Sequence, residues 1–325
     1  MRARRGVALL AALWLVVAIA AVALQFSIEA HERRTMGLLA SERGQQRALA
    51  SGAFALVRAR MEQALRLGPQ GATGNVARLR ASDPWLDVDS LYTGPVDVDS
   101  TEVDVVARDL GERLNINQLN ETEIQTFFSF LLRDMSTATK LAQSIMDWRD
   151  ADSIPRPSGA ERDAYIKAEQ LALPMNAPFR DVEDLRNVMG MTPEIYEKAA
   201  PYLTTRGSGQ VNINTAPEAV LRALPGMTDQ TLYLILQMRS QGRRIQSLSE
   251  VFAVQTRRAA RGGRGGGRGN PFQGIQNALQ SSATTTTNEV ELTFTARVGP
   301  QAPPTKLTAI LARTGTNTIV RYQQW

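Results

Sequence analysis

The sequence predicts an α+β chain in which a long amino-terminal helix and a small antiparallel sheet flank a large all-helical insert. Three observations lead to this fold class. An unbroken apolar run over residues 7–24 continues into a helix-patterned stretch. Short helical segments joined by glycine turns follow one another from residue 114 to about residue 254. Apolar and polar residues then alternate near the carboxyl terminus, which is typical of half-buried strands.

Composition excludes several classes of protein. The chain has 325 residues, of which 43% are hydrophobic, so two or more domains with sizeable cores are possible. It contains no cysteine and a single histidine, His31, which excludes disulfides, thiolate chemistry, a histidine-based triad and a multi-histidine metal site. The sequence shows no nucleophile paired with a base and no phosphate loop. We therefore predict that the protein is not an enzyme and expect no catalytic residue.

The amino terminus predicts a membrane span. Arg2, Arg4 and Arg5 precede Gly6, and the apolar run begins at Val7. About 18 apolar residues form a helix of about 27 Å, close to the hydrocarbon thickness of a bilayer. We place the transmembrane helix at residues 7–28. The basic residues predict that their side stays cytoplasmic and that the rest of the chain lies across the membrane.

This amino terminus resembles that of the type IV pilin and pseudopilin family. The resemblance implies that a prepilin peptidase cuts between Gly6 and Val7, leaving a leader of residues 1–6, and that the new amine of Val7 is methylated. The family usually carries a glutamate at the fifth mature position, where this chain has Ala11. Type II secretion protein K typically lacks that glutamate as well. A plain signal anchor is the alternative.

Two segments in the middle of the chain echo each other. "LNINQLNETEIQTFFSFLL" begins at residue 114 and "VNINTAPEAVLRALPGM" at residue 211. Each offers a capping pair for a helix start, Asn120 with Glu123 and Thr215 with Glu218. We predict a first helical subdomain at residues 114–205 and a second at residues 206–256, divided near the stretch "TTRGSGQ".

The helical segments resemble helix-hairpin-helix modules such as those of ComEA-like competence proteins. In that family two glycines flank one residue, and backbone N–H groups then point at a DNA phosphate. This chain has Gly190 and Gly226, but Thr192 and Thr228 stand at the second glycine positions. Acidic residues follow in the first helical turns, where they repel phosphate. Nucleic acid is therefore an unlikely partner, and a membrane-anchored, ComEA-like receptor for DNA uptake is the rival hypothesis.

A group of carboxylates surrounds two prolines in the first subdomain. Calcium is the cofactor that such a loop could hold, because it prefers several oxygen ligands. The alternative role is helix capping and turn formation. The weak calcium candidates are Asp147, Asp150, Asp152, Glu161 and Asp163.

The carboxyl-terminal third combines a predicted linker with predicted strands. Residues 257–287 begin with a glycine–arginine tract and continue into a serine–threonine run, so we expect a flexible linker there. Residues 288–325 then predict three antiparallel strands with one face on the long helix. That face contains Val290, Leu292, Phe294, Ala296 and Val298.

Taken in order, these features are similar to the general secretion pathway protein K family over nearly the whole chain. The resemblance implies a pilin-like α/β domain, made of residues 29–113 and 288–325, that carries a helix-hairpin-helix or SAM-like insert. It also implies a minor pseudopilin of the type II secretion system, anchored in the inner membrane with its bulk in the periplasm. Such a subunit would sit at the pseudopilus tip with minor pseudopilins of the I and J types. We expect the outer half of the helix, around Leu49, Phe54, Leu56 and Val57, to pack against those partners.

Overall fold

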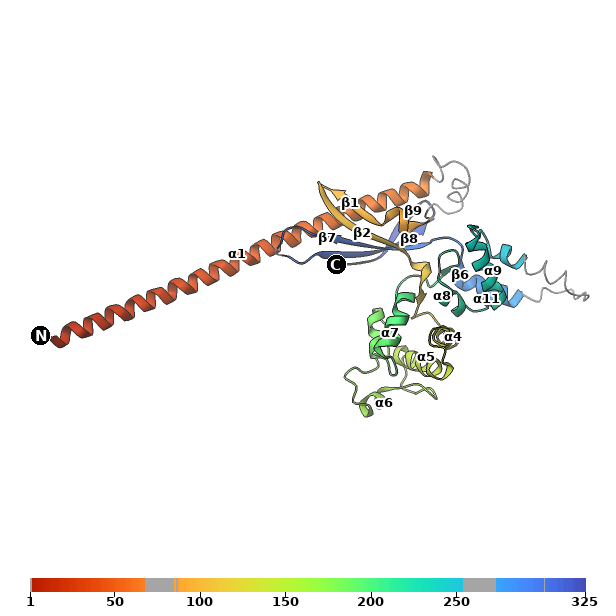
Figure 1. The fold of residues 1–325 in the computed structure, drawn as a ribbon, viewed down its shortest axis with the longest axis horizontal. Helices are drawn as coiled ribbons and strands as arrows, with labels where there is room; N and C mark the ends of the chain where they lie inside the picture. The colour runs from red at the N-terminus through yellow and green to blue at the C-terminus, as the bar shows by residue number, and fades with distance from the viewer. Residues whose placement is uncertain (1, 68–84, 86, 254–272, 301) are drawn as a thin grey trace, which may run out of the picture.

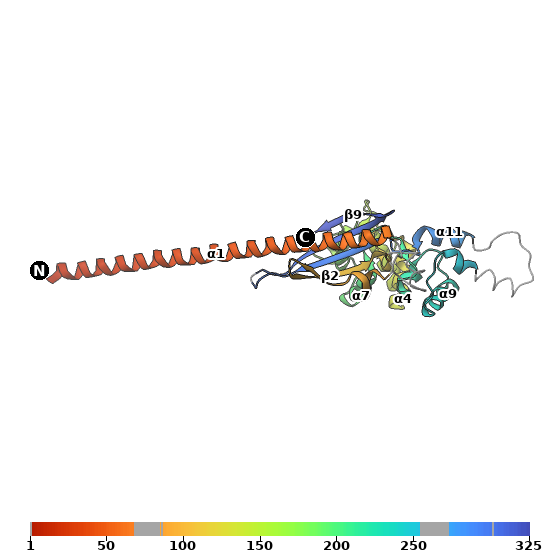
Figure 2. The same ribbon diagram turned by 90° about the horizontal axis from the view of Figure 1, so that it is seen from above.

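A computed structural model describes residues 2–67, 85, 87–253, 273–300 and 302–325. The predicted long helix is α1 (Arg2–Leu67). Its amino-terminal half projects alone, and its carboxyl-terminal half lies along a sheet (Figures 1 and 2). Within the described residues α1 is long and apolar enough to cross a membrane. The predicted glycine–arginine tract, residues 257–268, lies outside the described residues.

The sheet has five antiparallel strands in the order β1-β2-β7-β8-β9. The first two strands, β1 (Gly94–Val98) and β2 (Thr101–Asp109), follow the short helix α3 (Val88–Tyr92). The other three are β7 (Glu289–Ala296), β8 (Thr305–Thr314) and β9 (Asn317–Gln324), as the alternation predicts. Val290, Leu292, Phe294 and Ala296 are fully buried, and they form a core with α1.

The outer half of α1 packs against this sheet of its own chain. Val57 is buried there, and Leu49 and Phe54 are partly buried against the same core. The ring of Phe54 meets that of Phe294 edge to face, with centroids 5.9 Å apart. The expectation that these residues face partner subunits is therefore wrong for Leu49, Phe54 and Val57. Leu56, which is 42% exposed, points away from the sheet.

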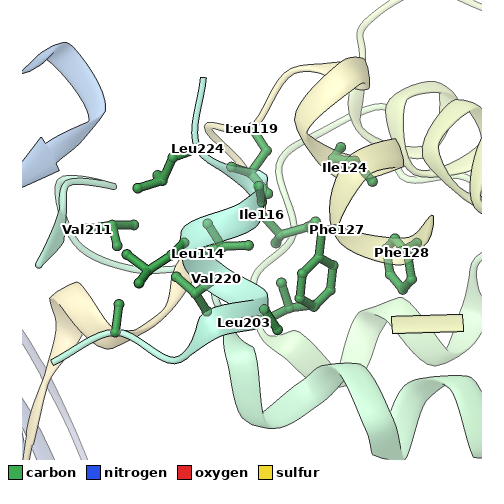
Figure 3. Close-up of a cluster of buried hydrophobic side chains, with 14 of the residues drawn as sticks. Leu114, Ile116, Leu119, Ile124, Phe127, Phe128, Leu203, Val211, Val220 and Leu224 are labelled. Carbon is green, nitrogen blue, oxygen red and sulfur yellow. The ribbon is translucent and has the colours of Figure 1, made fainter. Parts of the chain in front are cut away.

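The insert between β2 and β7 is mostly helical. It contains the helices α4 (Glu121–Leu132), α5 (Met135–Arg149), α6 (Arg162–Lys167), α7 (Pro193–Ala199), α8 (Glu218–Ala223), α9 (Asp229–Ser240) and α11 (Gln273–Ser282). Its described part also has three short 3₁₀ helices, η1 (Leu110–Glu112), η2 (Val182–Asn187) and η3 (Ala200–Tyr202). Buried residues from both predicted subdomains, such as Phe127 and Val220, share one core (Figure 3).

The echo in the sequence is a structural repeat. β3 (Leu114–Asn115) pairs in parallel with β4 (Leu203–Thr204), and β5 (Val211–Asn212) pairs in parallel with β6 (Ala283–Thr284). In the first unit the Asn117 amide donates to the Phe179 carbonyl oxygen (2.9 Å) and accepts from the Phe179 N–H (2.8 Å). In the second unit the Asn214 amide exchanges the same two bonds with Ile245, both at 2.9 Å.

In each unit of the repeat an arginine side chain donates hydrogen bonds to carbonyl oxygens of the Asn-Ile-Asn loop region. Arg149, at the end of α5, donates to the carbonyl oxygens of Ile116 and Leu119. Arg239, near the end of α9, donates to the carbonyl oxygens of Ala216 (2.6 Å) and Thr215 (3.3 Å). Each Asn-Ile-Asn loop is therefore held by its own asparagines and by one guanidinium group.

Two local predictions have different outcomes. The capping box at Asn120 and Glu123 is confirmed: the Asn120 side chain accepts from the Glu123 N–H at 3.0 Å, and the Glu123 carboxylate accepts from the Asn120 N–H at 2.7 Å. The cap proposed for Thr215 is wrong, because its hydroxyl donates to Asp109 at 3.0 Å. The start of α8 has no side-chain cap.

The predicted flexible linker is wrong for residues 273–284. α11 and β6 lie there, Leu279 and Ala283 are buried in the core of the insert, and Thr287 is buried just before β7. Composition indicated a linker because all but one of residues 281–287 are serine or threonine. In the structure those threonines form hydrogen bonds at the junction with the sheet.

The stretch "TTRGSGQ" is held on both sides. The Gly207 carbonyl oxygen accepts from the Asn115 amide at 2.9 Å, and the Ser208 N–H donates to Glu289 at 2.5 Å. The Arg206 guanidinium pairs with Asp181 at 2.7 Å and stacks over the Tyr322 ring of β9, 4.1 Å from its centroid. These contacts fix the insert against the sheet.

The packing of α1 predicts the effect of a charge at Phe54. Phe54→Asp removes a half-buried ring and places a carboxylate against the sheet, so it should lower the free energy of unfolding by about 3 kcal/mol. Thermal denaturation followed by circular dichroism measures the loss. Leu56→Asp, two residues away on the exposed face, is the control and should unfold like the unchanged protein. Equal destabilisation by both changes would contradict this packing.

Candidate functional site

The acidic loop joins the end of α5 to the start of α6. Asp147 lies in the last turn of α5, and Asp150 is the residue that ends the helix. Asp152 follows in the loop, Glu161 immediately precedes α6, and Asp163 lies in its first turn. Pro155 and Pro157 keep the intervening residues out of a helix, so the chain turns back and brings Glu161 near Asp150.

Three of the five candidate residues gather in one group. Asp150, Asp152 and Glu161 each offer a carboxylate oxygen, and these oxygens lie within 4.8 Å of one another. Two ligands on opposite sides of Ca²⁺, each at about 2.4 Å, are about 4.8 Å apart. The three carboxylates therefore have a spacing that one calcium ion could satisfy.

Three buried oxygens of this group lack the hydrogen bonds that buried carboxylates usually have. Glu161 is 5% exposed, and neither of its carboxylate oxygens has a hydrogen-bond partner among the described residues. The same holds for Oδ1 of Asp150. Burial, followed by the neighbouring Asp147 and Asp150, raises the pKa of Glu161. A hard divalent cation would balance the negative charge of these oxygens and would take the place of the missing hydrogen-bond donors.

The structure does not bring the other two candidates into the group. Asp147 is fully buried, and its Oδ1 lies 2.5 Å from Nη1 of Arg156. Asp163 is exposed on α6. Sequence reasoning also missed Arg156, whose charge complements the buried Asp147. The available signal was a lone arginine between two prolines inside an acidic stretch.

Neighbouring contacts fix the loop. The Asn176 N–H donates to the Trp148 carbonyl oxygen at 3.0 Å, and its amide donates to the Asp152 carbonyl oxygen at 2.6 Å. The Trp148 ring is stacked with that of Phe179, with an angle of 3° between the ring planes. A Cβ at Gly159 would lie 2.0 Å from Oδ2 of Asp147, so only glycine fits this close approach. The acidic loop is thus anchored to the core of the insert.

The two hairpin turns use their N–H groups internally. Gly190 and Gly226 have positive φ angles of 86° and 76°, as tight turns require. The Thr192 hydroxyl accepts from the Ile195 N–H, and the Thr228 hydroxyl accepts from the Thr231 N–H at 3.1 Å. In the DNA-binding form of such a turn, N–H groups at the helix start point at phosphate. Here the threonine hydroxyls accept from N–H groups at the helix starts in place of a phosphate oxygen. This arrangement favours a packing role for the hairpins over phosphate binding.

An ion pair and an arginine–aromatic contact link the second hairpin to α4. Asp229 lies 2.8 Å from Arg222, whose guanidinium covers the Phe130 ring of α4 at 4.8 Å. Together with Met227 and Leu232 these residues line a cavity of about 570 Å³ between α4 and the turn. The hairpin therefore faces another helix of the same chain.

Comparison with known proteins places these features in a family context. Residues 112–207 match the family model for the type II secretion system (T2SS), protein K. Type II secretion system protein K of Pectobacterium carotovorum subsp. carotovorum is 28% identical over 138 residues, which cover 37% of this chain and 42% of that protein. The corresponding protein of Dickeya chrysanthemi is 34% identical over 84 residues, covering 25% of this chain and 23% of that protein. The matched segments thus span less than half of these relatives.

A solved structure matches over a longer range. A chain in the crystal structure of the GspK-GspI-GspJ complex from the enterotoxigenic Escherichia coli type 2 secretion system superposes with a TM-score of 0.64 at 18% identity. The match covers 90% of this chain and 98% of that chain. At this identity it establishes the fold. The predicted fold class and the predicted family resemblance are confirmed.

Proposed function

We propose that this chain is a minor pseudopilin of a type II secretion system, anchored in the inner membrane with the sheet and the insert in the periplasm. One observation carries the proposal. A single helix continues from an apolar, fully exposed stretch into a five-stranded sheet that bears a helical insert, and the matched GspK-GspI-GspJ chain shares this fold. The role is structural: the chain supports export of folded proteins and performs no catalysis.

The partners that fit the exposed side of α1 are pseudopilins of the I and J types. Beyond the predicted membrane span, three large apolar side chains of α1 point away from the sheet: Met36 (72% exposed), Leu38 (47%) and Leu56 (42%). Burying such side chains against neighbouring helices contributes about 1.5–3 kcal/mol each. The solved complex contains GspK together with GspI and GspJ, which supports partners of this class.

Leu56→Asp should weaken binding to those partners without unfolding the protein. The change places a charge in the proposed helix–helix interface, and the residue makes no contribution to the core between α1 and the sheet. Co-purification with I-type and J-type pseudopilins should fall at least about tenfold. Leu56→Met keeps an apolar side chain of similar size at the same position and is the matched control. If Leu56→Asp co-purifies with the partners as well as the unchanged protein does, the proposal that this face of α1 binds them is wrong.

A place at the pseudopilus tip is consistent with Ala11 and with the insert. In pilin packing the fifth-position glutamate is thought to pair with the amino terminus of a neighbouring subunit. A terminal subunit has no such neighbour on one side, so alanine at position 11 would cost it no stabilising contact there. The insert projects well to the side of α1 and would obstruct the addition of a further subunit (Figure 1).

Processing should occur between Gly6 and Val7. The basic residues, the glycine and the immediate start of the apolar run are the features a prepilin peptidase would use. Mass spectrometry of the protein purified from membranes should show an amino terminus at Val7 carrying one methyl group. Gly6→Leu should leave the leader attached. An intact Met1 in the unchanged protein, in the presence of an active peptidase, would contradict a pseudopilin.

We also propose that Asp150, Asp152 and Glu161 hold a calcium ion. Support comes from the buried oxygens of Glu161, which have no hydrogen-bond partner among the described residues, and from the close spacing of the three carboxylates. A calcium ion here would join the end of α5 to the start of α6 and would stabilise the loop between them.

Removing a ligand should abolish the stabilisation by calcium. In the unchanged protein, calcium at about 100 times Kd should raise the free energy of unfolding by about 2.7 kcal/mol. Glu161→Gln should lose most of this gain, because the amide carries no charge. Asp163→Asn, outside the group, should keep it. Thermal midpoints in calcium and in EDTA measure the difference. If calcium raises the thermal midpoints of Glu161→Gln and Asp163→Asn equally, Glu161 is not a calcium ligand.

A further inference from the structure

The acidic loop contains a cation of its own. The Arg156 guanidinium lies between the end of α5 and the loop, with Nη1 2.5 Å from Oδ1 of Asp147 and 2.6 Å from Oδ2 of Asp150. Its Nε lies 3.5 Å from Glu121 on α4. Although burial alone would lower the pKa of Arg156, the hydrogen bonds that it donates to Asp150 and Asp147 raise it, so the side chain is charged at every relevant pH.

Asp150 belongs to two groups at once. Its Oδ2 accepts from Arg156, and its Oδ1 is buried without a hydrogen bond among the described residues. One of its carboxylate oxygens lies within 4.8 Å of oxygens of Asp152 and Glu161. The carboxylate of Asp150 therefore pairs with an arginine and also belongs to the proposed calcium site.

We propose that Arg156 is an internal counter-cation that shares Asp150 with the bound divalent ion and lowers the affinity of the site for it. This inference rests on the proposed calcium site. Two positive charges on one carboxylate repel each other, and at a partly buried position the repulsion is only weakly screened by water. Arg156 thus keeps the loop folded without calcium and makes binding of the ion weaker and more readily reversible.

The alternative role for Arg156 is to orient the carboxylate of Asp150 toward the proposed calcium site. The loop has other restraints that perform this task. The Asp150 N–H donates to the Met146 carbonyl oxygen at 3.0 Å, and Oδ1 of Asp152 accepts from the Ile154 N–H at 2.9 Å. Asn176 binds the loop from a third direction. Because backbone contacts already position the ligands, the charge of Arg156 should dominate its effect on affinity.

Calorimetric titration of the purified, EDTA-treated full-length protein with calcium chloride tests the proposal. Arg156→Gln should bind calcium at least about tenfold more tightly than the unchanged protein, because the repelling charge is gone. Arg156→Lys keeps the charge and should stay within about threefold. The rise in thermal midpoint on adding calcium should be larger for Arg156→Gln than for Arg156→Lys.

The buried Asp147 calls for a second pair of variants. Arg156→Gln removes the positive charge beside that buried carboxylate, and loss of a buried partner charge is destabilising. Asp147→Asn and the double variant Asp147→Asn/Arg156→Gln remove this difficulty and leave the three ligands intact. The double variant should again bind calcium at least about tenfold more tightly than Asp147→Asn.

The possible results separate the inference from the calcium site on which it rests. Calcium binding that is equal or weaker after loss of Arg156, in both backgrounds, overturns the inference and leaves the site in place. No calcium binding by the unchanged protein or by any variant overturns the site and the inference together. Binding that appears only after loss of Arg156 supports both.

Discussion

The buried carboxylate of Asp109 connects the sheet to the insert, and the arrangement of the whole molecule depends on it. Asp109 ends β2, and one oxygen accepts from the Gly111 N–H at 2.9 Å. The other accepts from the Asn212 amide at 2.8 Å and from the hydroxyls of Thr215 and Thr287, each at 3.0 Å. Burial raises the pKa of Asp109, and these bonds oppose the shift. One side chain thus joins the entry of the insert, its second repeat unit and its exit, so the insert is held as a fixed body.

Local features of the fold could be predicted from the sequence, because neighbouring residues determine them. The Asn120–Glu123 capping box and the alternation in β7 are of this kind. Contacts between distant segments could not be predicted from residue patterns. Thr215 looked like a helix cap, yet its hydroxyl binds a carboxylate 106 residues away. Phe54 lies on an apolar stripe that fits a partner subunit as well as its own sheet, and only the tertiary packing on Phe294 decides between them.

The acidic loop shows the same limit on a smaller scale. Clustered carboxylates indicated a cation site, and three of the five candidates do converge. The sequence could not say which three, because the answer depends on how two prolines and Gly159 turn the chain back on α5. It also gave no reason to separate Asp147 from its neighbours. That residue faces into the protein from the last turn of α5, where a guanidinium group is its partner.

The position of the insert within the sheet has a consequence for the order of folding. β2 pairs with β7 from Val103 opposite Ala296 to Asp109 opposite Val290. This pairing joins segments of the chain that are separated by the whole insert. Contacts of such long sequence separation form slowly, whereas the helices of the insert meet near neighbours. The insert can therefore be complete while β7, β8 and β9 are still being synthesised. Until those strands arrive, only β1 and β2 are available to cover the side of α1 that bears Val57 and Met61. The growing chain therefore passes through a stage in which a finished helical insert lies beside a partly covered apolar helix, and the arrival of β7, β8 and β9 ends that stage.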